Sequence, residues 1–458
     1  MSTQALGSIE ELSDKTKELF LSALQQGVVP ATGCTEPISI AYAAAVCMSY
    51  LESEQPSKHK AGCGAADKIE SLSIKVSPNI MKNALAVIVP GTSEPGLVIA
   101  AAAGALVGLA QEGLGVISKL EACELAQIKE FASSGKITAE LAAVEDDLYV
   151  EAVLIDKQGN RVECYIASEH THIFKLLRNG CSLIEKERPA PHAISPIKQA
   201  LQDCSFKQVW DFAHQIELEK ISFIDTAAEL NMKLAKIGLE QNFGLGLGRS
   251  IRQANNINFG GGMDADLCTK LIAYTSAASD ARMGGALLPA MSNSGSGNQG
   301  ITATVPVCVL AQELKLEGEK LTRALALSHL TALYIHAFLP VLSAFCAADS
   351  AAMGAAVGCC YLEGASYEKA CAAIKNMAGD VAGMVCDGAG CACAMKVASS
   401  VSSMYRAVNL ALQGIEIPSS NGMVCPCVDQ TIRGIGKLGT IGLKDTDETI
   451  ISIMTSKS

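Results

Sequence analysis

The sequence is poor in aromatic residues and has no run of five basic residues, and each shortage excludes a class of partner. Phe, Trp and Tyr make up 4% of its 458 residues, too few for a surface that stacks on nucleic-acid bases. The formal net charge is −11, which also disfavours nucleic acid and anionic membranes. We therefore expect a small-molecule substrate, with no nucleic acid and no membrane as partner.

The chain also lacks an apolar signal segment, because acidic residues interrupt its first twenty positions. We therefore expect a cytoplasmic protein. One stretch, residues 324–348, has no formally charged residue and is long enough to cross a bilayer. It contains polar residues, two histidines and a break at Pro340, so we expect a pair of buried core helices.

Apolar residues are abundant, at 49%, and 40 glycines accompany them, which favours closely packed helices. The length predicts two domains. Strand patterns are confined to the first part of the chain, so the predicted class is α+β, with an N-terminal α+β domain followed by an all-helical domain. We expect these domains at residues 1–190 and 191–458, joined by a charged, Pro-rich linker at 185–196.

Local patterns predict individual elements of the first domain. Period-2 alternation around a Gly-containing turn predicts a β-hairpin with strands at 149–155 and 161–168. A further strand is predicted at 84–91, and helices are predicted at 96–112 and 117–133.

Eighteen cysteines are present, and a reducing cytoplasm disfavours disulfides between them. Most are interpreted as small buried hydrophobic residues. Two stretches differ from the rest. Cys346 follows the break at Pro340, and CDGAGCACAMK, at 386–396, carries three thiols in a Gly-containing loop. Because a loop does not need buried hydrophobic residues, these thiols indicate a metal or iron–sulfur site.

The spacing of these cysteines narrows the kind of site. Structural zinc favours two short Cys pairs and bacterial ferredoxins carry a C-x₂-C-x₂-C run, and the segment 386–396 has neither. Three ligands from two distant segments describe a cluster with one iron left open. An open iron is a Lewis acid, which favours catalysis over electron transfer. A non-catalytic iron–sulfur redox sensor is the alternative.

The loop SNSGSGNQG, at 292–300, offers hydroxyls, amides and backbone N–H groups before a helical pattern, as a carboxylate cradle does. It is also similar to the cofactor loop of pyridoxal-phosphate enzymes, but the nearest upstream lysine, Lys270, lies inside a helical pattern. Asp280 and Arg282 either anchor the substrate or form a structural ion pair. The candidate substrate-binding residues are Ser292, Asn293, Ser294, Asn298 and Arg282.

The stretch ATGCTEP places Cys34 in a polar loop. Pro37 favours the first turn of a helix, so Cys34 is expected just outside a helix N-terminus, where the pKa of a thiol is lowered. Glu36 opposes that shift if it faces the sulfur, and it is itself an alternative base. The other interpretation of Cys34 is a filler in a turn.

Together, ATGCTEP, SDARMGG, SNSGSGNQG, Cys346 and CDGAGCAC resemble the bacterial and archaeal L-cysteine desulfidase family, which is serine dehydratase alpha-like and related to the iron–sulfur L-serine dehydratases. The resemblance spans residues 31 to about 440. It implies an oxygen-sensitive [4Fe–4S] cluster held by Cys346, Cys386 and Cys393, with Cys34 as the catalytic proton acceptor. Cys391 is an extra thiol, so the choice between Cys391 and Cys393 stays open.

The same resemblance implies a lyase that eliminates sulfide from L-cysteine to give pyruvate, ammonia and hydrogen sulfide. An iron–sulfur L-serine dehydratase is the alternative, because the two substrates differ by one atom. A homodimer is expected from the relatives.

We expect the histidines and Lys396 to have structural roles and not catalytic ones. His170 and His172 are expected on an exposed strand face, and His329 and His336 are expected to be hydrogen-bonded core residues. Lys396 is expected to offset the negative charge of a cluster.

Overall fold

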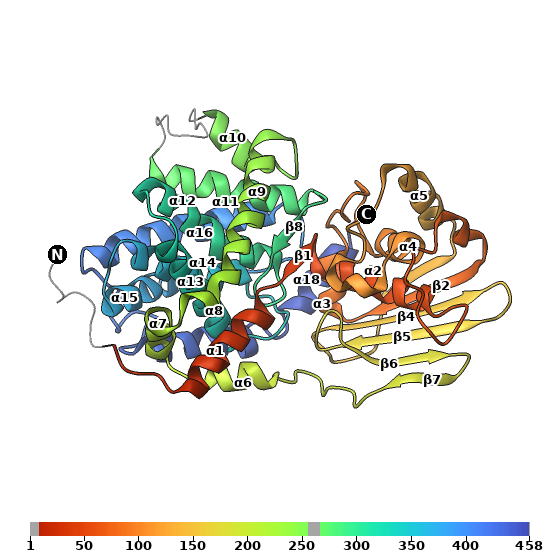
Figure 1. Ribbon diagram of the computed structural model, residues 1–458, viewed down its shortest axis with the longest axis horizontal. Helices are drawn as coiled ribbons and strands as arrows, with labels where there is room; N and C mark the ends of the chain where they lie inside the picture. Colours follow the sequence, from red (N-terminus) through yellow and green to blue (C-terminus); the bar gives the residue numbers. More distant parts are fainter. Residues whose placement is uncertain (1–8, 255–265, 458) are drawn as a thin grey trace.

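The computed structural model describes residues 9–254 and 266–457, which form two regions that lie side by side (Figure 1). One region contains a six-stranded sheet with helices packed on it, and the other is built mainly of helices. The predicted α+β class, with an α+β part followed by a helical part, is therefore confirmed.

The large sheet has the strand order β3-β2-β4-β5-β6-β7. Strands β2 and β3 run parallel, and every other neighbouring pair in this sheet is antiparallel. The predicted hairpin is confirmed, because Tyr149 pairs with Ala167 and Ile155 pairs with Arg161. The strands are β2 (Ile69–Val76), β3 (Ile137–Leu141), β4 (Tyr149–Asp156), β5 (Arg161–Ala167), β6 (Ile173–Arg178) and β7 (Cys181–Glu185).

Helix α2 packs on β4 and β5, and α4 packs on α2, so an apolar core lies between the sheet and these helices (Figure 1). The helices of this region are α2 (Thr35–Ser49), α3 (Pro78–Ala84), α4 (Leu97–Val107) and α5 (Leu125–Ser133).

The strand predicted at 84–91 is wrong. Ala84 is the last residue of α3, Ile88 forms an isolated bridge with Pro95, and the other residues form a loop. Pro90 interrupts the segment and lacks the N–H that a strand ladder needs.

The helix predicted at 117–133 begins only at Leu125. Glu121 and Glu124 form a capping box, in which each side chain accepts a backbone N–H of the other residue. This cap starts a short turn directly before α5, so the preceding residues stay outside the helix.

The helical region has α11, α12, α13, α14 and α16 at its centre. Small residues allow close approach: a Cβ added to Gly354 of α14 would lie 2.3 Å from the carbonyl oxygen of Ser328 on α13. The helices are α6 (Pro196–Gln202), α7 (Phe206–Gln215), α8 (Leu218–Ile221), α9 (Asp225–Glu240), α10 (Leu247–Ala254), α11 (Leu267–Met283), α12 (Gly297–Leu314), α13 (Glu319–His336), α14 (Ala347–Leu362), α15 (Tyr367–Ala378), α16 (Cys393–Leu412) and α17 (Val428–Lys437).

The uncharged stretch 324–348 forms most of α13, a loop around Pro340 and the start of α14, and it lies in the core, as predicted. Across residues 9–254 and 266–457, no helix combines the length and the apolar character that a bilayer span requires.

Each end of the chain packs against the region that is distant from it in sequence. Helix α1 (Asp14–Gly27) places Phe20 and Leu24 in the core of the helical region. Helix α18 (Thr446–Thr455) packs on α3, beside the sheet (Figure 1). The expected linker lies between β7 and α6, and the domain division at residues 190 and 191 stays a prediction.

Candidate active site

A two-stranded antiparallel sheet brings two of the predicted loops together. Strand β1 (Pro30–Thr32) precedes Cys34, strand β8 (Pro289–Met291) precedes the loop 292–300, and the two strands pair with each other. The helical region is therefore not purely helical, since it supplies β8. Arg282 adds a second link, because its Nε donates to the Gly33 carbonyl at 3.1 Å.

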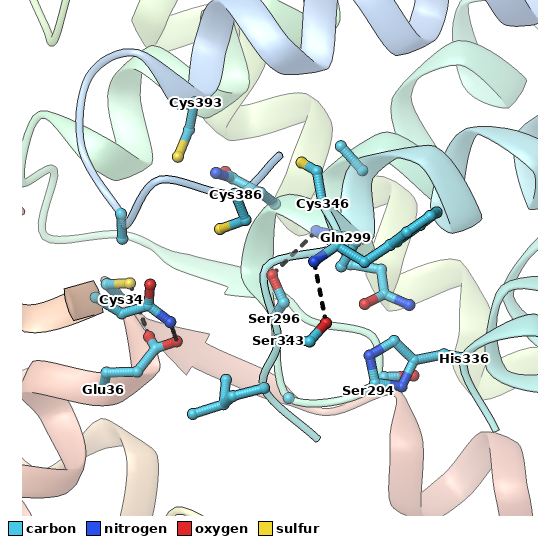
Figure 2. A pocket seen from close by; sticks show the side chains of 18 of the residues that line it. Cys34, Glu36, Ser294, Ser296, Gln299, His336, Ser343, Cys346, Cys386 and Cys393 are labelled. Atoms are coloured by element: carbon cyan, nitrogen blue, oxygen red, sulfur yellow. Dashed lines mark hydrogen bonds between the residues drawn. The ribbon is translucent and has the colours of Figure 1, made fainter. Parts of the chain in front are cut away.

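The two loops open onto a cavity of about 100 Å³ at the junction of the two regions (Figure 2). Residues far apart in the sequence line it, including most of those singled out above. The predicted site residues in its lining are Cys34, Glu36, Arg282, Ser294, Asn298, Cys346, Cys386 and Cys393.

One side of the cavity, which we call the acid wall, consists of Cys34, Glu36 and Asn83. The Cys34 Sγ donates to Glu36 Oε2 at 2.9 Å, and Asn83 Nδ2 donates to Glu36 Oε1 at 2.9 Å (Figure 2). Thr35 Oγ1 donates to Glu36 Oε2 at 3.1 Å. Cys34 precedes the first residue of α2 as predicted, and the three donors fix the carboxylate next to the thiol.

The expected lowering of the Cys34 pKa is wrong for this structure. Burial, followed by the negative charge of Glu36, raises the pKa of the thiol well above its ordinary value, and Arg282 counteracts this only in part. The pKa of Glu36 is lowered: burial alone would raise it, but His170 and the Cys34 hydrogen bond outweigh burial. The pair therefore rests as a neutral thiol that donates to a carboxylate.

The other side of the cavity, which we call the thiol wall, consists of Cys346, Cys386 and Cys393. Backbone hydrogen bonds place the first two beside each other, because Cys346 N donates to Met384 O at 2.9 Å and Cys386 N donates to Ala344 O at 2.7 Å. Cys393 begins α16, and Figure 2 shows all three side chains on the same side of the cavity. Cys391 is not part of the cavity lining.

Among the residues that the structure describes, no three His, Cys, Asp or Glu side chains converge closely enough to hold a single metal ion. A cluster sets a different requirement, because each thiolate binds a separate iron and the sulfurs stay further apart. Three thiols around an open space fit that requirement better than they fit one zinc ion.

The thiols of this wall influence one another. Burial, followed by the neighbouring Cys386, raises the pKa of the Cys346 thiol, and the same two causes raise the pKa of Cys393 to about 11. Cys346 and Cys393 are thus neutral thiols near pH 7, and binding a metal has to displace their protons.

Asp280 and Arg282 have separate partners, so the alternative of an ion pair between them is wrong. Asp280 accepts the backbone N–H groups of Leu245 and Gly248, which places it at the N-terminus of α10. Arg282 is 3% exposed and lies in the cavity lining. Only the arginine is positioned to meet a substrate.

Two of the expected substrate-binding residues belong to the scaffold. Ser292 is fully buried, and its Oγ donates to the Val29 carbonyl at 2.6 Å. Asn293 Nδ2 donates to the carbonyl of His329 at 3.0 Å and lies 3.1 Å from its Nδ1. Ser292 and Asn293 lie outside the cavity lining, where both side chains hold the loop in shape, whereas Ser294 and Asn298 line the cavity. Contacts between these residues and a substrate stay a prediction.

Sequence reasoning missed several lining residues, and four of them carry a buried polar atom without a hydrogen-bond partner. These atoms are Asn83 Oδ1, His170 Nε2, Gln299 Oε1 and His336 Nδ1. Gln299 and Ser296 lie in the loop 292–300, so the motif of that loop was the signal that could have found them. Asn83 lies in a short helix without any motif, so the sequence carried no signal for it.

The predictions for the histidines have different outcomes. His170 lies in the turn between β5 and β6 and is buried, so its expected place on an exposed strand face is wrong. His336 lines the cavity, whereas His329 is a satisfied core residue, as expected: its Nδ1 faces Asn293 and its Nε2 lies 2.9 Å from Thr304 Oγ1.

The two lysines considered from the sequence also differ. Lys396 lines the cavity, and its ammonium contacts the carboxylate of Asp387, next to Cys386. Lys270 is outside the cavity lining and pairs with Glu313 at 2.8 Å, so no lysine at that position faces the loop 292–300.

Known proteins resemble this chain along its length. The model of the family described as "Serine dehydratase alpha chain" matches residues 95–452. A UPF0597 protein of Latilactobacillus sakei subsp. sakei is 59% identical over 96% of this chain and 98% of its own length. A UPF0597 protein of Yersinia enterocolitica is 43% identical over 96% of each chain, and one of Cutibacterium acnes is 48% identical over 77% of this chain and 99% of its own. The matched range contains the thiol wall, and the chain belongs to the serine dehydratase alpha chain family.

Proposed function

We propose that the protein is an iron–sulfur lyase that eliminates sulfide from L-cysteine and releases pyruvate, ammonia and hydrogen sulfide. Membership of the serine dehydratase alpha chain family implies the coarser part, an iron–sulfur-dependent lyase. The observation that carries the proposal is the shared cavity, in which the thiol wall faces the same space as the acid wall.

Cys346, Cys386 and Cys393 would hold a [4Fe–4S] cluster in this account. Such a cluster, when bound, supplies an open iron that acts as a Lewis acid toward the leaving sulfur of the substrate. Thiolate donors are the ligands that iron–sulfur clusters prefer. Lys396 lies at the same side and brings a positive charge that offsets the negative charge of a thiolate-bound cluster.

The acid wall would accept the α-proton of the substrate. The Cys34 thiol already donates to Glu36, so the carboxylate takes the thiol proton as Cys34 takes the proton from the α-carbon. Asn83 and Thr35 hold Glu36 in place for this transfer. Loss of the α-proton and the β-thiolate leaves aminoacrylate, which tautomerises and hydrolyses in water to pyruvate and ammonia.

The polar lining suits a zwitterionic amino acid. Glu36 and the free amide oxygens of Asn83 and Gln299 are acceptors for an ammonium group. Arg282 and the N-terminus of α12, which Ser296 caps, are donors for a carboxylate. A buried polar atom without a partner is costly, so a substrate that satisfies these atoms gains affinity from them.

L-Serine dehydration is the second candidate, and the description of the matching family favours it. The two reactions are separated by assaying anaerobically purified, cluster-loaded protein with each amino acid. We expect L-cysteine to yield sulfide and pyruvate in equal amounts, at a higher kcat/KM than L-serine yields pyruvate.

Faster pyruvate formation from L-serine would replace the desulfidase assignment with the dehydratase. If neither amino acid reacts or alters the spectrum of the cluster, the protein is a non-catalytic iron–sulfur protein. Protein that forms pyruvate only after pyridoxal phosphate is added would contradict the cluster-based account.

A further inference from the structure

Lys82 is a lysine in α3 whose side chain is fully buried. Its ammonium contacts the carboxylate of Asp447, in the first turn of α18, and donates to the carbonyl oxygen of Cys386 at 3.2 Å. A lysine is almost never fully buried unless it is paired, because its charge loses the solvation of water. The structure thus places a charged donor at the backbone of a residue in the thiol wall.

The backbone around Cys386 is held from two directions. Its N–H donates to Ala344 O at 2.7 Å, which ties it to the segment before Cys346, and its C=O accepts from Lys82. Two residues later the loop runs directly against α3: a Cβ added to Gly388 would lie 2.7 Å from the Lys82 carbonyl oxygen. Gly388 has φ +107°, a conformation that glycine adopts without strain.

Helix α3 also reaches the acid wall, because the next residue, Asn83, donates to Glu36. Adjacent residues of one short, buried helix therefore contact both walls. Helix α18 contributes Asp447, whose carboxylate forms the ion pair with the buried Lys82 ammonium.

We propose that Lys82, held by Asp447, is a positioning residue that fixes the Cys386 backbone so that its thiolate can bind the cluster. This inference rests on the proposed function, because it assumes that Cys386 is a cluster ligand. Groups that orient metal ligands commonly change metal affinity about 10- to 100-fold when they are removed. A hydrogen bond from a charged donor to the backbone of a ligand is a contact of that kind.

Two variants separate positioning from simple structural support. Lys82→Met removes the donor and leaves the Asp447 carboxylate without its buried partner. The double variant Lys82→Met/Asp447→Leu removes both charges, and replacing a whole buried ion pair by apolar residues commonly preserves stability. Lys375→Met is the matched control, because Lys375 is a buried lysine that pairs with Glu416 at 3.1 Å and lies outside the cavity lining.

The measurements are iron and labile sulfide per chain after anaerobic reconstitution, the rate of cluster bleaching in air, and the thermal unfolding midpoint. We expect cluster bleaching to be about tenfold faster in both Lys82 variants than in the wild type. The double variant should recover the unfolding midpoint without recovering the cluster. Lys375→Met should bleach at the wild-type rate.

The inference is overturned if Lys82→Met keeps the cluster as the wild type does. It is also overturned if the double variant recovers both stability and cluster, because Lys82 would then serve only as the partner of Asp447. Wild-type protein that binds no cluster would instead contradict the proposed function itself, so the two failures are distinguishable.

Discussion

The thiol wall and the acid wall both present cysteine to the cavity, but the sulfur atoms have different neighbours. Cys34 donates to a carboxylate that Asn83 holds in place. The three cysteines of the thiol wall lie beside one another, and burial, followed by the neighbouring Cys386, raises the pKa values of Cys346 and Cys393. A thiol with an acidic partner is suited to proton transfer, and a group of adjacent thiols is suited to binding a metal. The neighbours, more than the residue type, define the two roles.

The largest effect should come from removing a thiol of the thiol wall. Iron per chain and the rate of sulfide release should fall to near background in Cys346→Ala, Cys386→Ala and Cys393→Ala. The reason is that all three cysteines hold the cluster in our proposal. Iron and labile sulfide analysis of anaerobic protein measures this.

Cys391→Ala is the matched control, since Cys391 belongs to the same loop but not to the cavity lining. It should keep the cluster. Loss of iron in Cys391→Ala, together with full iron in Cys393→Ala, would make Cys391 the third cluster ligand in place of Cys393.

Substitutions in the acid wall should lower activity without lowering the iron content. Cys34→Ala and Glu36→Gln should keep iron at the wild-type level while kcat falls roughly 10²- to 10⁴-fold, the usual contribution of a positioned acid–base group. Iron content and kcat measured on the same samples test the comparison directly. Loss of iron in Cys34→Ala would indicate that Cys34 is a cluster ligand. It would contradict the proposal that the two walls have different roles.

Asn83→Ala should sharpen the comparison by testing whether the acid wall also binds the substrate ammonium. It removes the unpartnered amide oxygen of a lining residue and one donor to Glu36, so KM for L-cysteine should rise about tenfold or more. Asn79→Ala is the control, because Asn79 is buried in the same helix and lies outside the cavity lining. Equal KM values in the two variants would contradict the ammonium-binding role.

The smallest effect concerns the scaffold behind both walls. Burial lowers the pKa of His329 to about 3, whereas an unfolded histidine titrates near 6.5. As the pH falls below about 6.5, the unfolded chain binds a proton that the folded chain cannot, so stability is lost toward low pH, by about 1.4 kcal/mol per unit.

The variant His329→Gln should be less stable at pH 7 but should lose less stability between pH 7 and pH 5. Urea unfolding at several pH values gives the slope of unfolding free energy against pH for the wild type and for the variant. Identical slopes in wild type and variant would show that His329 is not the group that titrates.

Elements with a strong local pattern could be predicted from the sequence, and contacts between distant segments could not. The hairpin of β4 and β5 follows from alternation and a turn, and the position of Cys34 before α2 follows from Pro37. The pairing of β1 with β8 joins segments about 260 residues apart, so no local pattern could show it.

The same reasoning explains why several side chains of the site lie elsewhere than their residue types suggest. Ser292 and Asn293 have side chains suited to a substrate, but packing directs them into the scaffold. Burial in the folded chain raises the Cys34 pKa, which the helix position alone would lower. Asn83 and His170 reach the cavity from elements without a motif, so only the fold shows their role.

The most direct test of the two-wall account is to add L-cysteine to anaerobic, cluster-loaded Cys34→Ala and to record the cluster spectrum, sulfide and pyruvate together. We expect the spectrum to change because the substrate reaches the thiol wall, while sulfide and pyruvate stay near background because the proton acceptor is missing. Sulfide and pyruvate formed at the wild-type rate, or a cluster spectrum that L-cysteine leaves unchanged, would contradict the account.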